Sequence, residues 1–419
     1  DPKLVNYNFK KNKKNEFFLN LLENLNNNRL YLQTADLQEK SLSITIESAD
    51  HFNPIIYSSR AAFISKEIAN LNNYDLDDVE VGHLIRGIKI NSIKYKSDDL
   101  SLTSRYPDVL VKRNTIVENA DINEHNNNEF RPTVNFPVFI YNISPEIRSH
   151  IGSPQRFAYI GLGIKASSEL QINRNLVIYS SIGRSFKDNF DKKVSDPVSS
   201  LPLVRTEIVD YLQQTSNRIY IDNLDIENIW SPYKNIFAKV SVGYLESMYG
   251  GIATEIAYKP FNRNFIVGVE YNKVKKRSYD QKFSFLDYKV STSHLNLSYY
   301  HPRSNILAKW SYGRYLAQDT GYTLDLSRRM QSGWRAGFFF SRTNVSPEQF
   351  GEGSFDKGFY FYIPIDIFFK GYSKDIAGIK LRTMTRDGGQ KLELKNRLVD
   401  SFYGSTKTEI DENWTNYLD

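Results

Sequence analysis

Large apolar and smaller or polar residues alternate along most of the chain after residue 132. Phe265, Val267, Val269 and Tyr271 are large and apolar, whereas the residues between them are Ile266, Gly268, Glu270 and Asn272. A period of two is typical of a β-strand with two different faces. Similar alternation recurs at 158–170, 236–244, 251–259, 334–342 and 359–369. This part of the chain is therefore predicted to be mainly β.

The connections between these strands alternate in length. Short turns are predicted at 173–175, 231–235, 260–264, 301–305 and 329–333, and longer links at 187–216, 245–251, 276–290, 315–319 and 344–354. A transmembrane barrel has short periplasmic turns and longer extracellular loops. We therefore predict a transmembrane antiparallel β-barrel of about 12–14 strands, with a water-soluble all-β fold as the alternative.

A membrane barrel and a soluble fold predict opposite orientations for the two faces. In a barrel with a polar lumen, Phe265, Val267, Val269 and Tyr271 face lipid and Glu270 faces the lumen. Charged residues recur on the polar faces of other strands. The candidates for the lumen and for contact with a glycan are Lys239, Glu255, Glu270, Lys309, Arg314, Asp325, Arg335, Lys357, Asp366 and Arg382.

The N-terminal part of the chain has a different pattern. Residues 1–15 are basic and rich in Asn and are predicted to be a flexible lead-in. Residues 16–105 show helical spacing at 16–25 and 58–71 and strand alternation around them, in the order α-β-β-α-β-β. This predicts a small α/β domain, followed by a polar linker at 106–131 and the barrel at 132–419. The domain is expected in the periplasm, beside the short turns.

Composition agrees with an exported β-rich protein. The chain has 419 residues and a mean hydropathy of −0.49, and no apolar run is long enough for a transmembrane helix. Aromatic residues make up 14% of the chain, which suits the aromatic girdles of a barrel. The sequence opens without a signal peptide, so an exported protein would be a mature or truncated form. Cysteine is absent, which excludes disulfides and thiolate chemistry.

No motif indicates an enzyme or a metal centre. The 6 histidines lack metal-ligand spacing, and no Walker loop, nucleophile elbow or dinucleotide fingerprint is present. The acidic run at 75–78 is interpreted as a solvated turn rather than an acid/base pair. The net charge of +6 is interpreted as solvated Lys and Arg. We therefore expect no catalytic residue, no cofactor, no metal and no nucleic-acid partner.

Several segments are more specific than strand patterning requires, and most fall at strand ends on the side of the longer links. Two interpretations stay open: Gly and Asp build turns and plugs there, or the segments form an aromatic, polar vestibule that contacts a carbohydrate chain. These segments are 200–212, 244–251, 278–288, 313–321, 350–358 and 386–392.

The same segments carry a resemblance to a known family. Together with "RTMTRDGGQKLELKNRL", they resemble the YjbH-type exopolysaccharide and group 4 capsule biosynthesis proteins over residues 130–419, and 16–105 resembles the family's preceding region more weakly. The resemblance implies a bacterial outer-membrane location and a role in making or exporting surface polysaccharide. Family members are commonly longer, which implies an N-terminal barrel half or separate subunit as a partner. The chain ends in "NWTNYLD" rather than in the terminal aromatic typical of outer-membrane strands, so either these residues lie beyond the last strand or assembly uses another signal.

Three functions follow as hypotheses. In the first, a non-enzymatic barrel in outer-membrane lipid helps a polysaccharide to cross or be retained, and the α/β domain docks periplasmic or outer-membrane export proteins. In the second, the barrel is closed and scaffolds secretion partners, which the bulky inward residues Phe237, Phe339, Tyr360 and Tyr362 favour. In the third, the protein is an enzyme that modifies the glycan.

Overall fold

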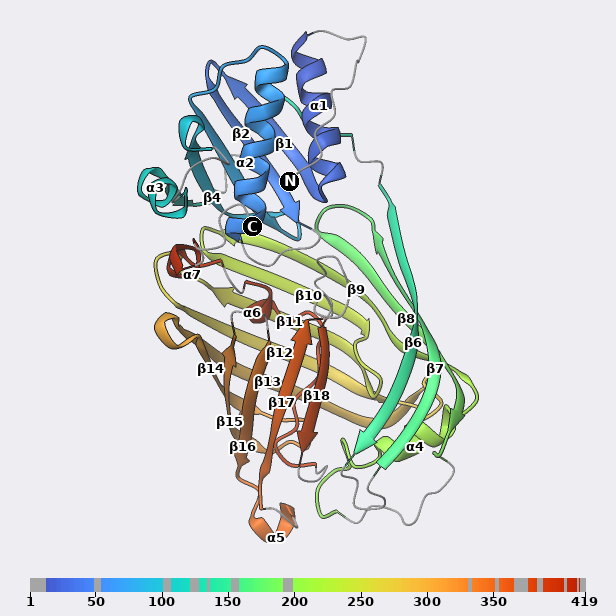
Figure 1. Ribbon diagram of the computed structural model, residues 1–419. Helices are drawn as coiled ribbons and strands as arrows, with labels where there is room; N and C mark the ends of the chain where they lie inside the picture. The colour runs from blue at the N-terminus through green and yellow to red at the C-terminus, as the bar shows by residue number, and fades with distance from the viewer. Residues whose placement is uncertain are drawn as a thin grey trace.

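The protein consists of a small α/β unit and a large curved antiparallel sheet (Figure 1). The computed structural model describes residues 13–48, 54–100, 107–120, 128–133, 136–151, 158–190, 199–330, 334–350, 354–364, 376–382, 387–402, 405–412 and 414. No helix in these ranges is both long and apolar enough to cross a membrane.

The α/β unit follows the predicted order of elements and extends beyond it. Its elements are α1 (Lys13–Asn27), β1 (Leu30–Gln38), β2 (Ser41–Ser48), α2 (Pro54–Leu71), β3 (Asp78–Ile85), β4 (Ile88–Lys96), α3 (Pro107–Asn114) and β5 (Ile116–Asn119). The strands form one sheet in sequence order, in which only β2 and β3 run parallel. The range 106–131, predicted as a linker, contains α3 and β5. Its last part also returns to the unit, because Phe130 bridges Ala35.

The spacing of apolar residues explains the core of this unit. Phe17, Leu21 and Leu25 recur at intervals of four on α1 and are fully buried, which is the stripe expected of a helix packed on one face. They pack with α2 against alternate residues of the sheet, such as Ile44 and Val81. The C-terminal residues Ile410 and Trp414 belong to the same core. Residues from the N-terminal and C-terminal parts of the described chain therefore share this core.

The large sheet contains thirteen strands in the described residues, paired in sequence order from β6 to β18. The strands are β6 (Val138–Ile151), β7 (Ala158–Gln171), β8 (Leu176–Asp188), β9 (Ile219–Tyr233), β10 (Ile236–Tyr244), β11 (Tyr249–Tyr258), β12 (Phe265–Arg277), β13 (Phe285–His301), β14 (Ile306–Arg314), β15 (Thr320–Arg329), β16 (Arg335–Thr343), β17 (Asp356–Pro364) and β18 (Ile376–Arg382). Neighbours are antiparallel throughout, and β6 and β18 are the two end strands.

The connections confirm most of the predicted turns but shorten two of the predicted longer links, 245–251 and 276–290, the second of which has only the residues between Arg277 and Phe285. The α/β unit lies against the short turns, where the side chain of Asn119 donates to Asn235 over 3.0 Å. The opposite end carries the longer links with α4 (Ile208–Gln214) and α5 (Pro347–Phe350) (Figure 1). The link predicted at 245–251 has only the residues between Tyr244 and Tyr249, because β11 starts earlier than its alternation suggested. Connection length therefore does not alternate at every position.

The odd number of strands in the described chain determines at which end of the sheet the last strand finishes. With 14 strands, both ends of the sheet would lie beside the α/β unit. With thirteen, β18 ends at the far end, and the chain returns across the concave side through α6 (Leu398–Ser401) to α7 (Lys407–Glu412) (Figure 1). We refer to the described residues between 387 and 414 as the C-terminal segment.

Candidate functional site

The two faces of the large sheet are oriented as the alternation predicted. On β12, Val269 and Tyr271 are 55% and 50% exposed, whereas the alternate residues Glu270 and Asn272 are buried. Phe265 and Val267 are half-buried on the outward side. A side chain on a strand alternates between faces, so the apolar set points away from the concave interior and Glu270 points into it.

The outward apolar residues form a continuous band across neighbouring strands. Ile256 pairs with Val269, which pairs with Leu295, which pairs with Tyr312, and all four are exposed. Other exposed members are Ile160, Leu162, Ile164, Val242, Ile252, Leu297, Phe338 and Phe359. Contiguous apolar surface of this extent is unusual on a soluble monomer and marks an interaction site for a membrane or for another protein.

The concave side is occupied by the C-terminal segment. The segment begins at the end of the sheet that carries the longer links, where Asp387 is buried. Its carboxylate accepts from the backbone N–H groups of Val204, Arg205 and Thr206 over 2.8–3.1 Å and from the hydroxyl of Thr206 over 2.8 Å. A carboxylate with four donors is strongly held, so Asp387 fixes the start of the segment.

Loops from distant parts of the chain pack around this end. Arg205 makes a two-pronged ion pair with Glu246, with distances of 2.7 and 3.1 Å, and also donates to the carbonyl of Lys391. Apolar residues of the predicted special segments form one buried cluster there: Val204, Tyr211, Leu245, Met248, Tyr249, Leu316, Ala317 and Leu392. Of the two interpretations left open from sequence, this packing favours turns and plugs over an open vestibule.

Glu270 is the central charge of the interior. Its carboxylate lies 2.6 Å from Arg397 Nη1 and 3.5 Å from Lys391 Nζ of the C-terminal segment, and 3.0 Å from Nδ1 of His294 on β13. The Glu270 side chain is 2% exposed. Buried charges are stable only when they are paired, so the segment supplies the cations that this wall residue requires.

Lys239 and Glu255 make the next contact along the segment. Lys239 Nζ lies 2.8 Å from Glu255 and 3.5 Å from Glu227, and donates to the backbone carbonyl of Asn396. The backbone N–H of Leu398 donates to Glu255 over 2.7 Å. The Lys239 side chain has no exposed surface. The polar groups of this wall are therefore directed at the peptide backbone of the segment.

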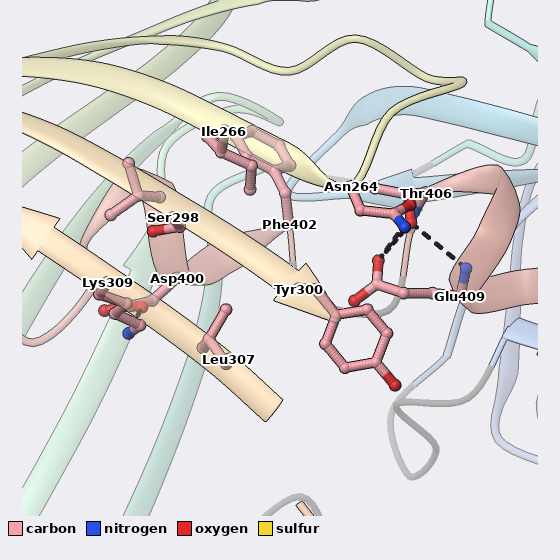
Figure 2. A pocket seen from close by; sticks show the side chains of 11 residues that line it. Asn264, Ile266, Ser298, Tyr300, Leu307, Lys309, Asp400, Phe402, Thr406 and Glu409 are labelled. Carbon is pink, nitrogen blue, oxygen red and sulfur yellow. Dashed lines mark hydrogen bonds and ion pairs between the residues drawn. The ribbon is translucent and has the colours of Figure 1, made fainter. Parts of the chain in front are cut away.

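The end of the interior beside the α/β unit is closed by α6 and the residues after it. Figure 2 shows Asp400 paired with Lys309, and Phe402 packed under Ile266. Phe402 also packs on Phe237, with ring centroids 4.2 Å apart. The cavity between the sheet and the segment measures about 20 Å³, which is room for about one water molecule.

Thr406 and Glu409 form the start of α7. The Thr406 hydroxyl accepts from the N–H of Glu409 over 3.3 Å, and the Glu409 carboxylate accepts from the N–H of Thr406 over 3.0 Å (Figure 2). This reciprocal pair is a capping box, which the sequence T-x-x-E favours. Nearby, burial lowers the pKa of Lys259 to about 8, although Glu409 opposes the shift. The Lys259 ammonium donates to the carbonyl of Ser405 over 3.0 Å.

The remaining predicted site residues divide between the two faces. Asp325 and Arg335 lie inside, where the Tyr360 hydroxyl donates to Asp325 over 2.7 Å and Arg335 lies 3.4 Å from the same hydroxyl. Arg314 and Lys357 were predicted to line the lumen. Each lies two residues from an exposed residue of its own strand, Tyr312 and Phe359 respectively, and therefore lies on the outward face. Arg382 lies opposite Gly358 in the register of β17 and β18. Asp366 lies outside the described residues.

The predicted inward aromatics do face the interior. Phe237, Phe339 and Tyr360 are buried, and Tyr362 stacks obliquely on Tyr360 with ring centroids 5.1 Å apart. The sequence did not identify Lys391, Arg397 and Asp400, which complete the ion pairs of the wall. The available signal was the loss of strand alternation after residue 387, where a charged segment follows the last strand. Among the described residues, no cluster of His, Asp and Glu could hold a metal ion.

The fold and site define a class of protein: a large curved antiparallel sheet with an apolar exterior and an interior filled by its own C-terminal segment. Comparison with known sequences then gives the family. The family described as "Exopolysaccharide biosynthesis protein YbjH" matches residues 5–403. The chain belongs to this family, as the sequence motifs predicted.

A curated relative and several solved structures are also similar. The "Uncharacterized lipoprotein YjbH" of Escherichia coli K12 is 36% identical over 270 residues, which cover 62% of the chain and 38% of that protein. The chain thus spans well under half the length of this relative. The Salmonella typhi OmpF complex with daunomycin aligns with a TM-score of 0.28 and 11% identity, covering 64% of this chain and 93% of that one. Vibrio cholerae OmpT aligns with a TM-score of 0.25 and 8% identity, covering 61% and 93%.

Proposed function

We propose that the chain is a non-enzymatic outer-membrane component of an exopolysaccharide assembly or export system, and that it acts as a barrel-like scaffold for its partners whose interior is plugged by its own C-terminal segment. Membership of the exopolysaccharide biosynthesis family supports the process. The exposed apolar band across β11 to β14 supports the membrane location. The α/β unit lies beside the short turns, and the periplasmic side of an outer-membrane barrel carries such turns.

One observation carries the choice of a closed form. Four inward charges on β10 to β14 are bound by the C-terminal segment: Lys239 and Glu255 by residues 396–398, Glu270 by Lys391 and Arg397, and Lys309 by Asp400. Charges that are paired with the segment in this way are not available to bind a passing glycan. The remaining space of about 20 Å³ beside α6 is far below that needed for a sugar ring.

A second candidate function is a gated conduit. It is favoured by the polar character of the contacts between the C-terminal segment and the sheet. The segment is bound to its wall largely through ion pairs and hydrogen bonds, such as those of Glu270 and Lys239. Its departure would leave a polar channel wall rather than an exposed apolar core. In this alternative the segment moves aside and the freed charges contact the polysaccharide.

Locking the segment in place separates the two functions. The chain contains no cysteine, so a pair introduced at Phe237 and Phe402, whose rings touch, can be linked by a short bismaleimide in cells. A scaffold retains surface exopolysaccharide when locked, whereas a gated conduit loses it. Each single cysteine variant treated with the same reagent is the control for labelling alone. Loss of polysaccharide only in the linked double variant would contradict the closed scaffold.

The free edge of β6 is the place where we propose that a further β-rich partner pairs. Phe139, Ile140 and Tyr141 are consecutive and exposed, by 60%, 51% and 69%, so both faces of the strand are uncovered. β6 is also an end strand of the sheet, and unpaired edges readily accept another strand. Cysteine crosslinking from Ile140 to a co-expressed N-terminal half of the longer protein tests this. Equal crosslinking from Ile256, in the middle of the sheet, would argue against edge pairing.

A further inference from the structure

A second cavity lies at the junction between the α/β unit and the short turns of the large sheet. It measures about 330 Å³, which is within the range of small-molecule sites. Residues of both units line it, among them Thr45, Lys89, Arg131, Arg174, Asn175 and Trp230. Ligand sites are common at such interfaces between structural units. The cavity is separate from the interior that the C-terminal segment fills.

The lining of this cavity is cationic. It includes Lys89, Arg131 and Arg174 but no Asp or Glu. Lys89 has a carboxylate partner at 3.6 Å, Glu80, whereas within the described residues Arg131 and Arg174 make no ion pair. Burial and the neighbouring charge of Arg131 lower the pKa of Arg174. Two guanidinium groups held close without a counter-charge repel each other, and a bound anion would relieve that repulsion.

The walls of the cavity are held in place by a tight turn. Arg86 and Gly87 join β3 and β4 with positive φ angles of 51° and 74°, as in a type I′ hairpin turn. A Cβ on Gly87 would lie 3.0 Å from the carbonyl oxygen of Arg174. The Arg86 guanidinium donates to Glu227 on β9 over 3.1 Å. The turn is therefore fixed against the sheet and packs closely on the backbone of Arg174.

The other lining groups suit a ligand that carries hydroxyls beside its charge. Trp230 offers an aromatic face and is 38% exposed, while Thr34, Thr45 and Asn175 offer polar side chains. Arginine binds carboxylate and phosphate through paired N–H donors. We propose that this cavity binds an anion flanked by hydroxyls, such as the carboxylate of an acidic saccharide, with Arg131 and Arg174 as its ligands. The choice of a saccharide rests on the proposed function.

The test is direct binding to the detergent-purified full chain. Oligogalacturonate is the acidic probe and maltohexaose is its neutral counterpart, both measured by calorimetry. Charged hydrogen bonds contribute about 1.5–3 kcal/mol each, so Arg174→Gln and Arg131→Gln should each weaken binding by about 10- to 150-fold. Arg263→Gln removes an exposed arginine from another short turn outside the cavity lining. This control should bind the acidic probe as the unchanged protein does.

A further binding experiment distinguishes an anion on a saccharide from an anion on a lipid headgroup. Nanodiscs containing phosphatidylglycerol present the same chemistry, a phosphate beside hydroxyls, from a lipid. Loss of nanodisc binding alone in the two cavity variants assigns the site to a lipid headgroup, and loss of oligogalacturonate binding assigns it to a saccharide. Unchanged binding in both arms, or equal binding of maltohexaose, would overturn the proposal. These measurements do not depend on whether the barrel conducts, so they fail independently of the proposed function.

Discussion

At the scale of single residues, the interior is organised around Glu270. Its carboxylate is buried and contacts Arg397, Lys391 and His294. Removing one partner of a buried ion pair leaves an uncompensated charge, which usually costs about 3–5 kcal/mol. The contact thus links a strand residue to a segment that is 127 positions away in the sequence.

Replacing Glu270 should therefore loosen the C-terminal segment more than it changes the sheet. We expect Glu270→Gln to lower the free energy of unfolding by about 3 kcal/mol, because Arg397 and Lys391 lose their counter-charge. Urea unfolding of the detergent-solubilised chain, followed by tryptophan fluorescence, measures the loss. Glu348→Gln, at an exposed position on α5, is the matched control. An equal loss in the two variants would contradict the assigned role of Glu270.

His83 gives a prediction about pH in the α/β unit. Burial lowers the pKa of His83 to about 3, although the hydrogen bond to Asn91 opposes the shift. The unfolded chain takes up this proton near pH 6.5, so between about pH 3 and 6.5 the unfolded state binds more protons. Stability therefore rises with pH across this window and falls as pH decreases, by up to about 1.4 kcal/mol per pH unit.

Hydrogen exchange at β3 and β4 measures this local stability. Between pH 6.5 and 4.5, protection should fall more steeply in the unchanged protein than in His83→Gln, which has no proton to gain. The comparison is made at each pH, so that the intrinsic pH dependence of exchange cancels. Parallel slopes for the two proteins would show that His83 is not kept neutral by the fold.

At the scale of elements, the C-terminal segment is attached at both ends by different kinds of contact. Asp387 holds its start through hydrogen bonds. Phe402 and the capping box of α7 hold its end. After this, Ile410 and Trp414 are buried in the core of the α/β unit. The segment therefore couples the interior of the large sheet to the unit beside its short turns.

Truncating the aromatic contact should release the end of the segment. Phe402→Ala removes a fully buried ring, which typically costs about 3–5 kcal/mol. We expect faster proteolysis between residues 387 and 412, while the strands remain resistant. Phe283→Ala, which removes an aromatic ring that is 69% exposed, should leave the cleavage rate unchanged. Cleavage of Phe402→Ala at the unchanged rate would contradict anchoring by this contact.

The strands could be predicted because a period of two survives in the sequence. The range 236–244 was predicted with the bounds that the structure has. The C-terminal segment has no such period, since its residues meet the wall through individual charges. Arg397 and Lys391 look like solvated residues in sequence, and only the fold brings them to Glu270. Ion pairs between residues this far apart in the sequence leave no pattern in the local sequence from which they could be predicted.

The misplaced candidates show a second limit. Arg314 and Lys357 were assigned to the lumen by their charge, although they share parity with Tyr312 and Phe359. Both lie at strand ends on the side of the longer links, where an outward charge reaches beyond the apolar band to water. At the ends of the strands, a charged residue can therefore lie on either face. Its spacing from neighbouring apolar residues of the same strand predicts the face better than its charge does.

At the scale of the whole molecule, the apolar band is predicted to contact lipid. Val269→Arg places a charge in the middle of the band, between Ile256 and Leu295. Such a charge costs about 2–4 kcal/mol near the membrane midplane, so the variant should assemble poorly in the outer membrane. Lys273→Arg changes an exposed residue on the same face that is already charged and serves as the control. Equal amounts of heat-modifiable protein in the membrane fraction would contradict lipid contact at Val269.

The central claim is that the C-terminal segment closes the interior of the large sheet. The most direct test is the single-channel conductance of the purified chain in a planar bilayer, compared with a variant that carries Arg397→Gln and Asp400→Asn. These changes remove the ion pairs to Glu270 and Lys309 while keeping both side chains polar. The account predicts no steady current from the unchanged chain and frequent openings from the variant. A steady current from the unchanged chain that the cell's own polysaccharide blocks would contradict closure and favour a conduit.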